Sequence, residues 1–584
     1  MNNRIKKIQD YLKNNKFDAF FVPREDQYLN EYLPSAFERL KWLTNFSGSS
    51  GIAIILKKKS PIFTDGRYTI QINQEVNKNL FSVFHINEFN YWIKKNLFNY
   101  TVAFDPWLFS IHKFNSIKKN LSYNKIKFIQ LTKNPIDTLW KNRPSLPKTK
   151  AYLHGIKYTG ESVIKKILKT QKIIKRKKSD YLLLTSIDSI AWLLNLRGND
   201  IDYIPLNLAY ALVPNKGKII LYINKKKISQ KIIKHFYSTV IFKSDSEIID
   251  IYKIIPKKSI VGIDIKKTPY AFKTIFSKNS IKIKYFDDPC YKLKSVKNKV
   301  ELKGARKANI RDGASLTKFL YWITKHKKLK SIDEMLAEKK LLKIRKRNEY
   351  FVSPSFSTIS AFGANASVPH YRVSRKTNVK FSKDSLYLVD SGGQYFDGTT
   401  DITRTIALGK PTNEQKDRFT RVLKGHIALS TVIFSRKTKG SDLDYLARKF
   451  LKKINCDYDH GTGHGIGSFL SVHEGPQRIS KLPRKYDCFL KNGMILSNEP
   501  GYYKKDEYGI RIENLIIVNK LKNNKLKFET ISWAPLDKEM ILLEMLTKAE
   551  IRWINSYHKK VYNKINKHLN LKEKNWLKNI TKPI

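Results

Sequence analysis

The chain contains little cysteine, and this scarcity excludes disulfide-rich and zinc-finger domains. Its three cysteines, Cys290, Cys456 and Cys488, lie far apart in 584 residues. An odd, widely spaced set neither builds a disulfide framework nor has the paired spacing of a zinc finger. Thiols of this kind are typical of a reducing compartment, and we predict a cytoplasmic protein.

Long apolar runs are also missing. A membrane-spanning helix needs about 20 predominantly apolar residues, and the apolar stretch at residues 187–196 is far shorter. The N-terminal segment MNNRIKKIQDYLKNNKF alternates Lys and Asn with isolated apolar residues, so it lacks the continuous apolar centre of a signal peptide. We therefore predict neither a membrane partner nor export.

Acidic residues are few beside basic ones. The chain has 112 Lys and Arg against 50 Asp and Glu, a formal net charge of +62, which ordinarily suggests nucleic acid or an anionic membrane surface as partner. The lysines are spread through every segment, however, and no basic tract alternates with aromatic residues as in proteins that stack single-stranded bases. We expect a solvated basic surface with no specific nucleic-acid partner, and only weak, salt-sensitive binding to polyanions.

Composition and length indicate a folded protein of several domains. Hydrophobic residues make up 41% and aromatic residues 12% of the chain, which is typical of globular proteins. A length of 584 residues exceeds what one hydrophobic core organises. Apolar segments such as DAFFVP and GIAIIL predict buried strands, and they alternate with helical patterns. The predicted fold class is α/β (α+β).

The order of these patterns predicts three domains. The stretch RPSLPKTK, which ends at Lys150, interrupts a first cycle of helix, apolar strand and hairpin, and a second, similar cycle follows. Duplication and composition bias both explain so faint a repeat, and the alternatives stay open. From about residue 294 the segment KNKVELKGARKANIRDGASLTKFLYWI has helical spacing. We predict domains over 1–148, 149–293 and 294–584, the last with a helical extension from about 535.

The third predicted domain concentrates acids and histidines beside glycines. In LYLVDSGGQYFDGTTDITRTI an apolar strand ends at Asp390, a turn-like segment follows, and the strand pattern resumes around Asp401. A hairpin would bring these two carboxylates side by side. Because buried adjacent carboxylates repel unless a proton or a cation neutralises them, this pattern predicts a metal site.

Two further segments supply more ligands. DHGTGHGIGSFLSVHEGP carries His460, His464 and His473 around glycines, and GMILSNEPGYYKKDEYGIRIENLIIV carries Glu499 at the end of one strand and Glu513 in the next. Glycines let the backbone approach closely. One histidine with four carboxylates is a hard, oxygen-rich set that favours a pair of manganese, cobalt or zinc ions over a closed structural zinc.

Each residue taken singly also has an ordinary structural interpretation. Asp401 could be an acid at the exit of a turn, His464 a core histidine, and Glu499 a surface acid before proline. Five such residues in the order acid, acid, histidine, acid, acid, each beside strand and glycine signals, would require five independent accidents, so the metal interpretation is favoured.

These segments also carry a family resemblance. VDSGGQYFDGTTDITRT, HGTGHGIGSFLSVHEGP and NEPGYY…GIRIEN resemble the signatures of the pita-bread metallopeptidases, the superfamily of creatinase, prolidase and methionine aminopeptidase. Over nearly all 584 residues the chain is similar to the three-domain form of aminopeptidase P (Xaa-Pro aminopeptidase). FSGSSGIAII, FTDGRY, VPHY and LTKAEIRWINSYH carry this finer similarity. It implies two creatinase-N-like α/β domains followed by a C-terminal pita-bread catalytic domain.

The resemblance implies an activity. A chain of this family would be a metalloaminopeptidase that hydrolyses the N-terminal Xaa-Pro bond of peptides carrying proline second, by attack of a metal-bridging hydroxide. The expected cofactors are two divalent ions, Mn²⁺ first and Zn²⁺ or Co²⁺ as alternatives. A homodimer is implied too. The implied metal ligands are Asp390, Asp401, His464, Glu499 and Glu513.

Further roles come from the same resemblance. Glu499 would also be the proton shuttle between the attacking water and the leaving proline nitrogen. His370 and His473 would act on the substrate and the tetrahedral intermediate, and His460 would line the substrate pocket. Arg511, two residues before Glu513, would support the glutamate network and the substrate.

Three alternatives stay open on the residues alone. A prolidase, which cleaves Xaa-Pro dipeptides, would share the ligands and the fold. A non-catalytic pita-bread protein could bind peptides or nucleic acid, although such proteins typically lose ligands. Arg67 could contact substrate, or it could be a turn arginine paired with Asp65.

Overall fold

The computed structural model describes residues 2–326, 328–481, 483–484 and 487–584. The chain forms two compact units. The first contains the chain up to Leu153 together with Ser162–Cys290, and the second contains His154–Glu161 and Tyr291–Ile584. The predicted boundary at 293 lies close to the division between the units, whereas no division falls at 148. The three-domain division therefore stays a prediction.

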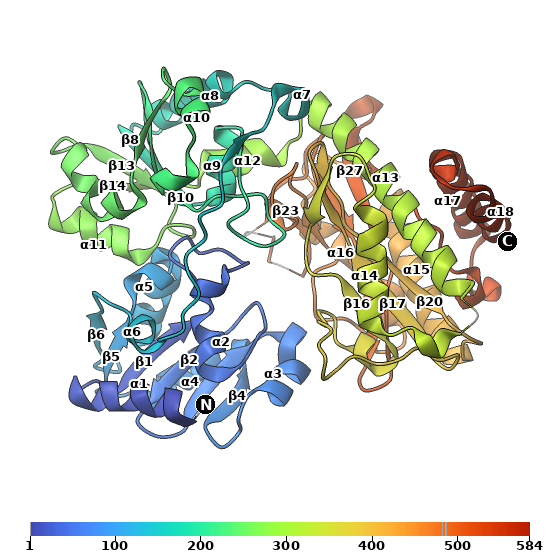
Figure 1. The fold of residues 1–584 in the computed structure, drawn as a ribbon, viewed down its shortest axis with the longest axis horizontal. Helices are drawn as coiled ribbons and strands as arrows, with labels where there is room; N and C mark the ends of the chain where they lie inside the picture. Colours follow the sequence, from blue (N-terminus) through green and yellow to red (C-terminus); the bar gives the residue numbers. More distant parts are fainter. Residues whose placement is uncertain (1, 327, 482, 485–486) are drawn as a thin grey trace. The chain divides into compact units, whose positions relative to one another are not determined.

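The first unit contains two mixed six-stranded sheets (Figure 1). In the first sheet the strand order is β4-β3-β2-β1-β5-β6, and Phe20 of the fully buried central strand pairs with Ile55. The strands are β1 Ala19–Pro23, β2 Ile52–Leu56, β3 Ser60–Thr64, β4 Phe81–His85, β5 Thr101–Phe104 and β6 Lys127–Gln130. The helices are α1 Asn2–Asn14, α2 Arg39–Thr44, α3 Thr69–Glu75, α4 Phe89–Asn96, α5 Ile111–Asn120 and α6 Pro135–Leu139.

The second sheet repeats the topology of the first. Its order is β12-β11-β10-β8-β13-β14, and in both sheets the central strand pairs antiparallel with one neighbour and parallel with the other. The faint sequence repeat therefore corresponds to a repeated fold. The strands are β8 Tyr181–Leu184, β10 Ala209–Pro214, β11 Ile219–Ile223, β12 Val240–Lys243, β13 Ile260–Ile263 and β14 Lys282–Tyr285, with the short pair β7 Tyr152–Leu153 and β9 Leu196–Arg197. The helices are α8 Val163–Arg176, α9 Ile187–Leu193, α10 Gln230–His235 and α11 Tyr270–Lys278.

The parts of the chain that form the second unit begin with helical segments. The short helix α7 Ile156–Thr159 and the end of α12 Pro289–Ser295 precede the long helix α13 Lys299–Thr324. Helix α13 begins at a capping box in which the Asn298 side chain accepts from the backbone of Glu301 and the Glu301 carboxylate accepts from the backbone of Asn298. It packs beside α14 Glu334–Arg345 (Figure 1).

The strands of the second unit form small and large antiparallel sheets. One three-stranded sheet has the order β16-β17-β20 and another has β15-β18-β19, while a six-stranded sheet has the order β21-β28-β27-β24-β22-β23 and a hairpin pairs β25 with β26. The strands are β15 Phe351–Pro354, β16 Ile359–Phe362, β17 Leu386–Ser391, β18 Gly393–Tyr395, β19 Gly398–Thr399, β20 Ile402–Ala407, β21 Ile433–Ser435, β22 Gly463–Gly465, β23 Glu474–Ile479, β24 Ile495–Asn498, β25 Gly501–Lys504, β26 Tyr508–Arg511, β27 Asn514–Lys520 and β28 Lys525–Thr530.

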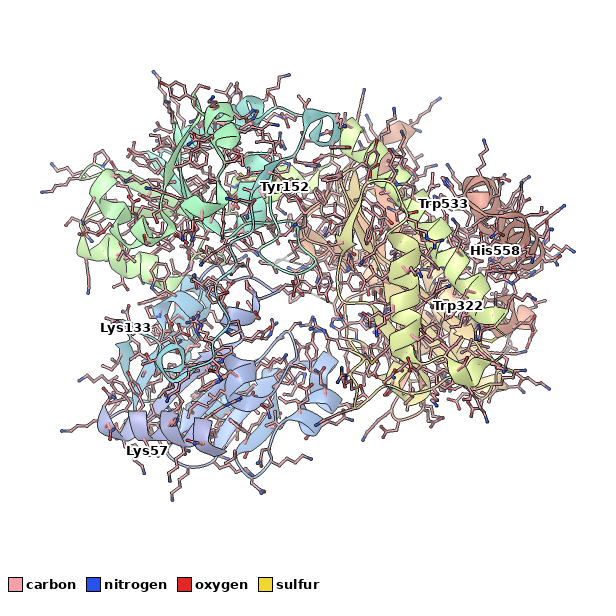
Figure 2. The ribbon with its side chains drawn as sticks, viewed as in Figure 1. Lys57, Lys133, Tyr152, Trp322, Trp533 and His558 are labelled. Atoms are coloured by element: carbon pink, nitrogen blue, oxygen red, sulfur yellow. The ribbon has the colours of Figure 1, made fainter. Side chains whose placement is uncertain are left out.

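The predicted C-terminal extension packs into the core of the second unit. The helices α15 Asn413–Thr431 and α16 Asp444–Lys452 lie between the strands in sequence, and α17 Lys548–Ile565 and α18 Leu571–Ile580 end the chain. Val561 of α17 shares one buried cluster with Phe419 of α15 and with Ile512. Figure 2 labels Trp533 and His558, which both lie in this part of the chain and are buried. The extension is therefore part of the core of this unit.

Among the described residues, no helix combines the length and the apolar character that a membrane span requires.

Candidate metal centre

The two aspartates lie on neighbouring strands, as predicted. Asp390 is in β17 and pairs with Thr403 of β20, while Asp401 immediately precedes β20. The chain between them does not form a simple turn, because residues 393–395 and 398–399 are strands of a separate sheet. The sequence pattern predicted that the two strands lie side by side, and β17 and β20 are indeed paired, but it missed this second sheet.

The other three predicted ligands come from adjacent strands of the six-stranded sheet. His464 is in β22, Glu499 directly follows β24, and Glu513 directly precedes β27. The Glu513 backbone N–H donates to the Thr403 carbonyl at 3.3 Å, which joins this sheet to the strand of the aspartates. The GYY segment between the glutamates forms strand β25 of a hairpin with β26.

Glycines allow this sheet to close around His464. A Cβ atom on Gly463 would lie 2.1 Å from the carbonyl oxygen of Ser497, and one on Gly465 would lie 2.3 Å from that of Glu474. Any side chain at either position would therefore push a neighbouring strand away. Gly463 and Gly465 of the HGTGHG segment are therefore needed for this close approach.

The ligand atoms converge on one small volume. Asp401, His464 and Glu513 each place a ligand atom so that all three lie within 4.8 Å of one another. The His464 Nε2 atom lies 3.5 Å from an Asp401 oxygen and 3.4 Å from a Glu499 oxygen. Asp390 joins the group through Arg511, whose Nη2 donates to Asp390 Oδ2 at 2.7 Å.

Several carboxylate oxygens in this cluster are buried without a hydrogen-bond partner among the described residues. They are Oδ1 of Asp390, Oδ1 of Asp401 and Oε1 of Glu513, on side chains that are at least nine-tenths buried. A buried anionic oxygen without a donor is costly unless a cation or a proton satisfies it. The residues present thus fit a pair of divalent cations.

The pKa shifts of the acids are also consistent with a site for divalent cations. Burial, reinforced by the neighbouring carboxylates, raises the pKa of Asp401 and the pKa of Glu513 well above their ordinary values. Burial also raises the pKa of Glu499 to about 7, although the charge of Arg511 opposes the shift. Without a cation, this cluster therefore retains protons near neutral pH.

Arg511 links the ligands to an aromatic neighbour that sequence reasoning missed. Its Nη1 donates to the Tyr503 hydroxyl at 2.5 Å, and its Nε donates to Thr403 Oγ1 at 3.3 Å. Thr403 Oγ1 in turn donates to Glu513 Oε2 at 2.7 Å. The predicted link between Arg511 and Glu513 exists, through Thr403. Tyr503 stands in the GYY motif, and its closeness to Glu499 in sequence is the only signal that could have identified it.

Two of the three predicted substrate histidines lie at the cluster. The His460 Nε2 atom is 2.8 Å from the Tyr503 hydroxyl. The His473 ring packs almost perpendicular to the His464 ring, with 4.4 Å between centroids. His370 is partly exposed in the turn after the short 3-10 helix Gly363–Ser367, and that helix packs against β26, where a Cβ on Gly509 would lie 1.8 Å from the Ala366 carbonyl oxygen.

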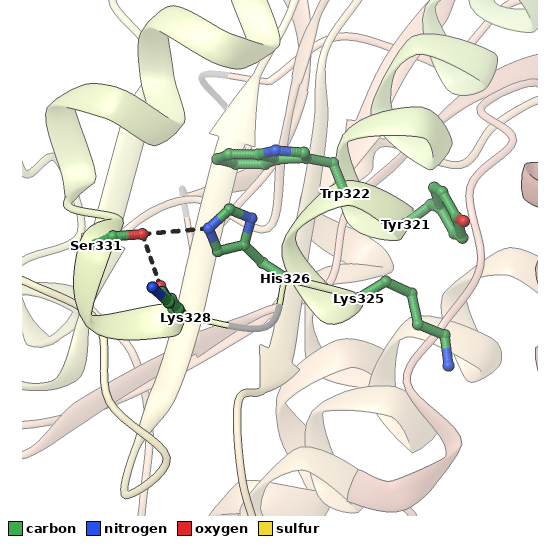
Figure 3. A pocket seen from close by; sticks show the side chains of 6 residues that line it. All are labelled: Tyr321, Trp322, Lys325, His326, Lys328 and Ser331. Carbon is green, nitrogen blue, oxygen red and sulfur yellow. Dashed lines mark hydrogen bonds between the residues drawn. The ribbon is translucent and has the colours of Figure 1, made fainter.

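Arg67 of the first unit and a surface pocket of the second unit involve other residues. The Arg67 guanidinium donates twice to Asp65, at 2.8 and 2.7 Å, which is the turn ion pair considered for it. Among the described residues, those that line a surface pocket at the end of α13 include none of the predicted site residues and no carboxylate (Figure 3). It is lined by Tyr321, Trp322, Lys325, His326, Lys328 and Ser331.

Family models match almost the whole chain. Residues 303–520 match metallopeptidase family M24, and residues 524–584 match the C-terminal region of peptidase M24. Residues 4–139 and 142–301 each match a creatinase/prolidase N-terminal domain.

Individual proteins match over the same length. A probable Xaa-Pro aminopeptidase P of Paracoccidioides brasiliensis (strain Pb03) is 35% identical over 100% of this chain and 99% of its own. The crystal structure of an X-prolyl aminopeptidase from Caenorhabditis elegans, described as a cytosolic enzyme with a di-nuclear active site, superposes with a TM-score of 0.94 at 30% identity and covers 100% of this chain and 99% of that one. A recombinant prolidase from Thermococcus sibiricus is similar in fold, with a TM-score of 0.52 at 23% identity over 64% of this chain and 98% of its own.

Proposed function

The chain belongs to metallopeptidase family M24 as an aminopeptidase P of the pita-bread fold, and we propose that the acid and histidine cluster of its second unit is the catalytic centre. It is a metalloaminopeptidase that removes the first residue of peptides carrying proline second, and it uses two divalent metal ions. The proposed metal ligands are Asp390, Asp401, His464, Glu499 and Glu513.

One observation carries the assignment of the ligands. Three buried carboxylate oxygens, on Asp390, Asp401 and Glu513, have no donor among the described residues. Two of these side chains, Asp401 and Glu513, each place a ligand atom within 4.8 Å of one on His464. Hard oxygen donors with a single imidazole suit manganese, and we propose Mn²⁺ as the ion, with Zn²⁺ and Co²⁺ as alternatives.

When bound, the metal pair would acidify a water molecule and polarise the carbonyl of the scissile bond. The protein supplies the proton transfer. Glu499 lies at the edge of the cluster, with its side chain 16% exposed and 3.4 Å from His464 Nε2, so a proton can reach it from the attacking water. We propose that it passes this proton to the leaving proline nitrogen.

Residues beside the proposed ligands would position Asp390 and the substrate. Arg511 holds Asp390 and Tyr503 at once, which fixes the carboxylate and places the tyrosine hydroxyl beside His460. We propose that His473, packed on the ring of His464, and His370 donate hydrogen bonds to the substrate carbonyl and to the oxyanion that forms from it. His460 and Arg511 would shape the substrate pocket.

Similarity over the whole chain favours the aminopeptidase over the prolidase. The aminopeptidase relatives match both units and the C-terminal extension, whereas the prolidase similarity is one of fold and leaves more than a third of this chain uncovered. We also propose a cytoplasmic homodimer and the division into domains 1–148, 149–293 and 294–584. Sedimentation of the purified protein would test the dimer.

A peptide-length assay tests the activity. The Mn²⁺-loaded enzyme is expected to remove one residue from a longer peptide that begins Arg-Pro-Pro and to leave the N-acetylated peptide intact. Cleavage of Xaa-Pro dipeptides without trimming of the longer peptide would instead assign a prolidase. Glu499→Gln should lower kcat by at least about 100-fold, which is the usual contribution of a general acid–base group, whereas the exposed Glu544→Gln should leave kcat unchanged.

A further inference from the structure

A buried polar layer lies directly behind the two glutamates and ligates nothing itself. It consists of Arg404 on β20, His426 on α15 and Tyr557 on α17, all fully or almost fully buried. Buried polar side chains are costly unless each has partners. Their partners are backbone and side-chain groups of residues next to the proposed ligands.

Arg404 connects the backbone that follows Asp401 with the backbone at Glu513. Its Nη1 donates at 2.7 Å both to the Thr403 carbonyl and to the Glu513 carbonyl. Its Nη2 donates to the Asn514 side chain at 2.9 Å and to the Ala534 carbonyl at 2.9 Å. One guanidinium therefore fixes the backbone at Glu513 relative to the strand that follows Asp401.

Tyr557 supplies the connection from the C-terminal extension. Its hydroxyl accepts from Arg404 Nη2 at 2.7 Å and donates to the Ala534 carbonyl at 3.0 Å. The ring is stacked between Trp553, at 5.3 Å and 1° between planes, and Trp533, at 5.9 Å and 22°. Because two indole rings hold the phenol, the hydroxyl is a fixed acceptor for the guanidinium.

His426 connects β24, which precedes Glu499, with β27, which follows Glu513. Its Nδ1 lies 3.1 Å from the Asn498 carbonyl, and its Nε2 lies 3.1 Å from the Asn514 side-chain amide. A carbonyl only accepts, so Nδ1 carries the proton and Nε2 accepts from the amide. Burial and the charge of Arg404 lower the pKa of His426 to about 3, which keeps this neutral form. Asn498 and Asn514 are opposite each other in β24 and β27 and adjoin Glu499 and Glu513.

We propose that Arg404, His426 and Tyr557 are positioning residues that set the affinity of the site for metal, and that the C-terminal extension takes part in the metal centre through the Tyr557 hydroxyl. The inference rests on the proposed function, because it takes Glu499 and Glu513 as ligands. By fixing the backbone beside both glutamates, the layer keeps the carboxylates convergent before the metal arrives, so less order must be imposed on binding.

Tyr557→Phe removes the hydroxyl and leaves the stacked ring. Without it, the Arg404 guanidinium loses one acceptor and shares the remaining ones, which loosens its hold on the carbonyls of Thr403 and Glu513. Groups behind metal ligands typically change metal affinity by about 10- to 100-fold when removed. Since one hydrogen bond of several is lost, we expect Mn²⁺ to bind about 10-fold more weakly.

The experiment is a calorimetric titration of the metal-free, full-length protein with Mn²⁺ alone, combined with thermal unfolding of the same metal-free samples. Tyr562→Phe is the matched control, because Tyr562 lies on the same helix and packs at the edge of the same core. Tyr210→Phe controls for lost stability, because it removes a buried hydroxyl that donates to the Gln27 carbonyl at 2.7 Å in the other unit. Both controls should bind Mn²⁺ within about 2-fold of the wild type, even where the unfolding temperature falls.

If Tyr557→Phe does not fold, two variants of His426 test the inference instead. His426→Gln keeps a donor and an acceptor and should stay within about 3-fold of wild-type affinity, whereas His426→Leu removes both and should lose about 10-fold. Wild-type affinity in folded Tyr557→Phe, or in both His426 variants, would overturn the inference. If the wild type itself bound no Mn²⁺, the proposed metal site would fail instead, so the two failures are distinguishable.

Discussion

Binding of Mn²⁺ to the metal-free protein should release protons, because the buried cluster has more carboxylates than positive charges to balance them. Four carboxylates of the cluster, on Asp390, Asp401, Glu499 and Glu513, face one guanidinium, that of Arg511. Full ionisation would leave three negative charges uncompensated in a buried volume. The metal-free cluster must therefore keep protons, and two divalent cations would displace them.

The raised pKa values give the expected number and its dependence on pH. The pKa values of Asp401 and Glu513 lie well above their ordinary values because of burial and mutual repulsion, and the pKa of Glu499 is about 7 because of burial. We expect release of at least about half a proton per chain at pH 7, because a carboxyl group with a pKa of about 7 is half protonated there. Between pH 7 and pH 8 the contribution of Glu499 should fall from about one half to about one tenth of a proton, since fewer of its carboxyl groups are then protonated.

The assay is calorimetric titration of the EDTA-treated enzyme with Mn²⁺ in two buffers whose ionisation enthalpies differ. The slope of the observed enthalpy against the ionisation enthalpy counts the protons exchanged. The titration should be made at pH 6, 7 and 8, and the count should decline as the pH rises. A count below about half a proton that stays constant from pH 6 to pH 8 would refute the reasoning, because it would mean that the acids are already ionised in the metal-free site.

Three further changes test the geometry around the cluster. Arg511→Leu leaves Asp390 buried without its ion-pair partner. Loss of one member of a buried pair typically costs about 3 to 5 kcal/mol of stability, so we expect urea unfolding to show a loss of this size, with a smaller loss for Arg511→Lys. Equal stability of Arg511→Leu and the wild type would exclude this role. Burial raises the pKa of Glu499 from 4.5 to about 7, so this group stabilises the metal-free fold below about pH 4.5 and loses that stability as the pH rises to about 7, a difference of roughly 3 kcal/mol. Urea unfolding of metal-free Glu499→Gln should therefore depend less on pH than unfolding of the wild type, and an unchanged pH dependence would contradict the shift. Tyr503→Phe removes the hydroxyl shared by Arg511 and His460 and should lower kcat/KM about 10-fold, measured with the peptide beginning Arg-Pro-Pro; unaltered kinetics would remove Tyr503 from the substrate pocket.

Local patterns in the sequence predicted several elements of the fold. The apolar runs DAFFVP and GIAIIL are β1 and β2, paired and buried in the first sheet. The helical pattern of KNKVELKGARKANIRDGASLTKFLYWI is the long helix α13, and the helical extension expected from about residue 535 contains α17 and α18. These elements follow from side-chain periodicity and turn residues within a few positions, which a single sequence contains. The shared topology of the two sheets could be suspected from their similar order of elements but not established.

The grouping of the acids with His464 could be predicted because these residues stand in or beside strands, next to glycines. The residues that position the proposed ligands could not be predicted in this way. Tyr503 reaches Arg511 and His460 only because β25 folds back on β26, and Arg404 meets Tyr557 across 153 positions of the chain. Such contacts depend on how distant elements pack, and nothing in the local pattern of DITRT or WINSYH indicates them. The small sheet of β15, β18 and β19 was missed for the same reason, since glycine-rich strands of two or three residues resemble turns.

Metal analysis of the purified chain tests the central claim most directly. Purified in the presence of Mn²⁺ and then dialysed, the protein should retain two equivalents of metal per chain, and Glu513→Gln should retain fewer. A wild-type protein that holds no metal after this treatment, yet is folded, would contradict the assignment of Asp390, Asp401, His464, Glu499 and Glu513 as a dinuclear metal site.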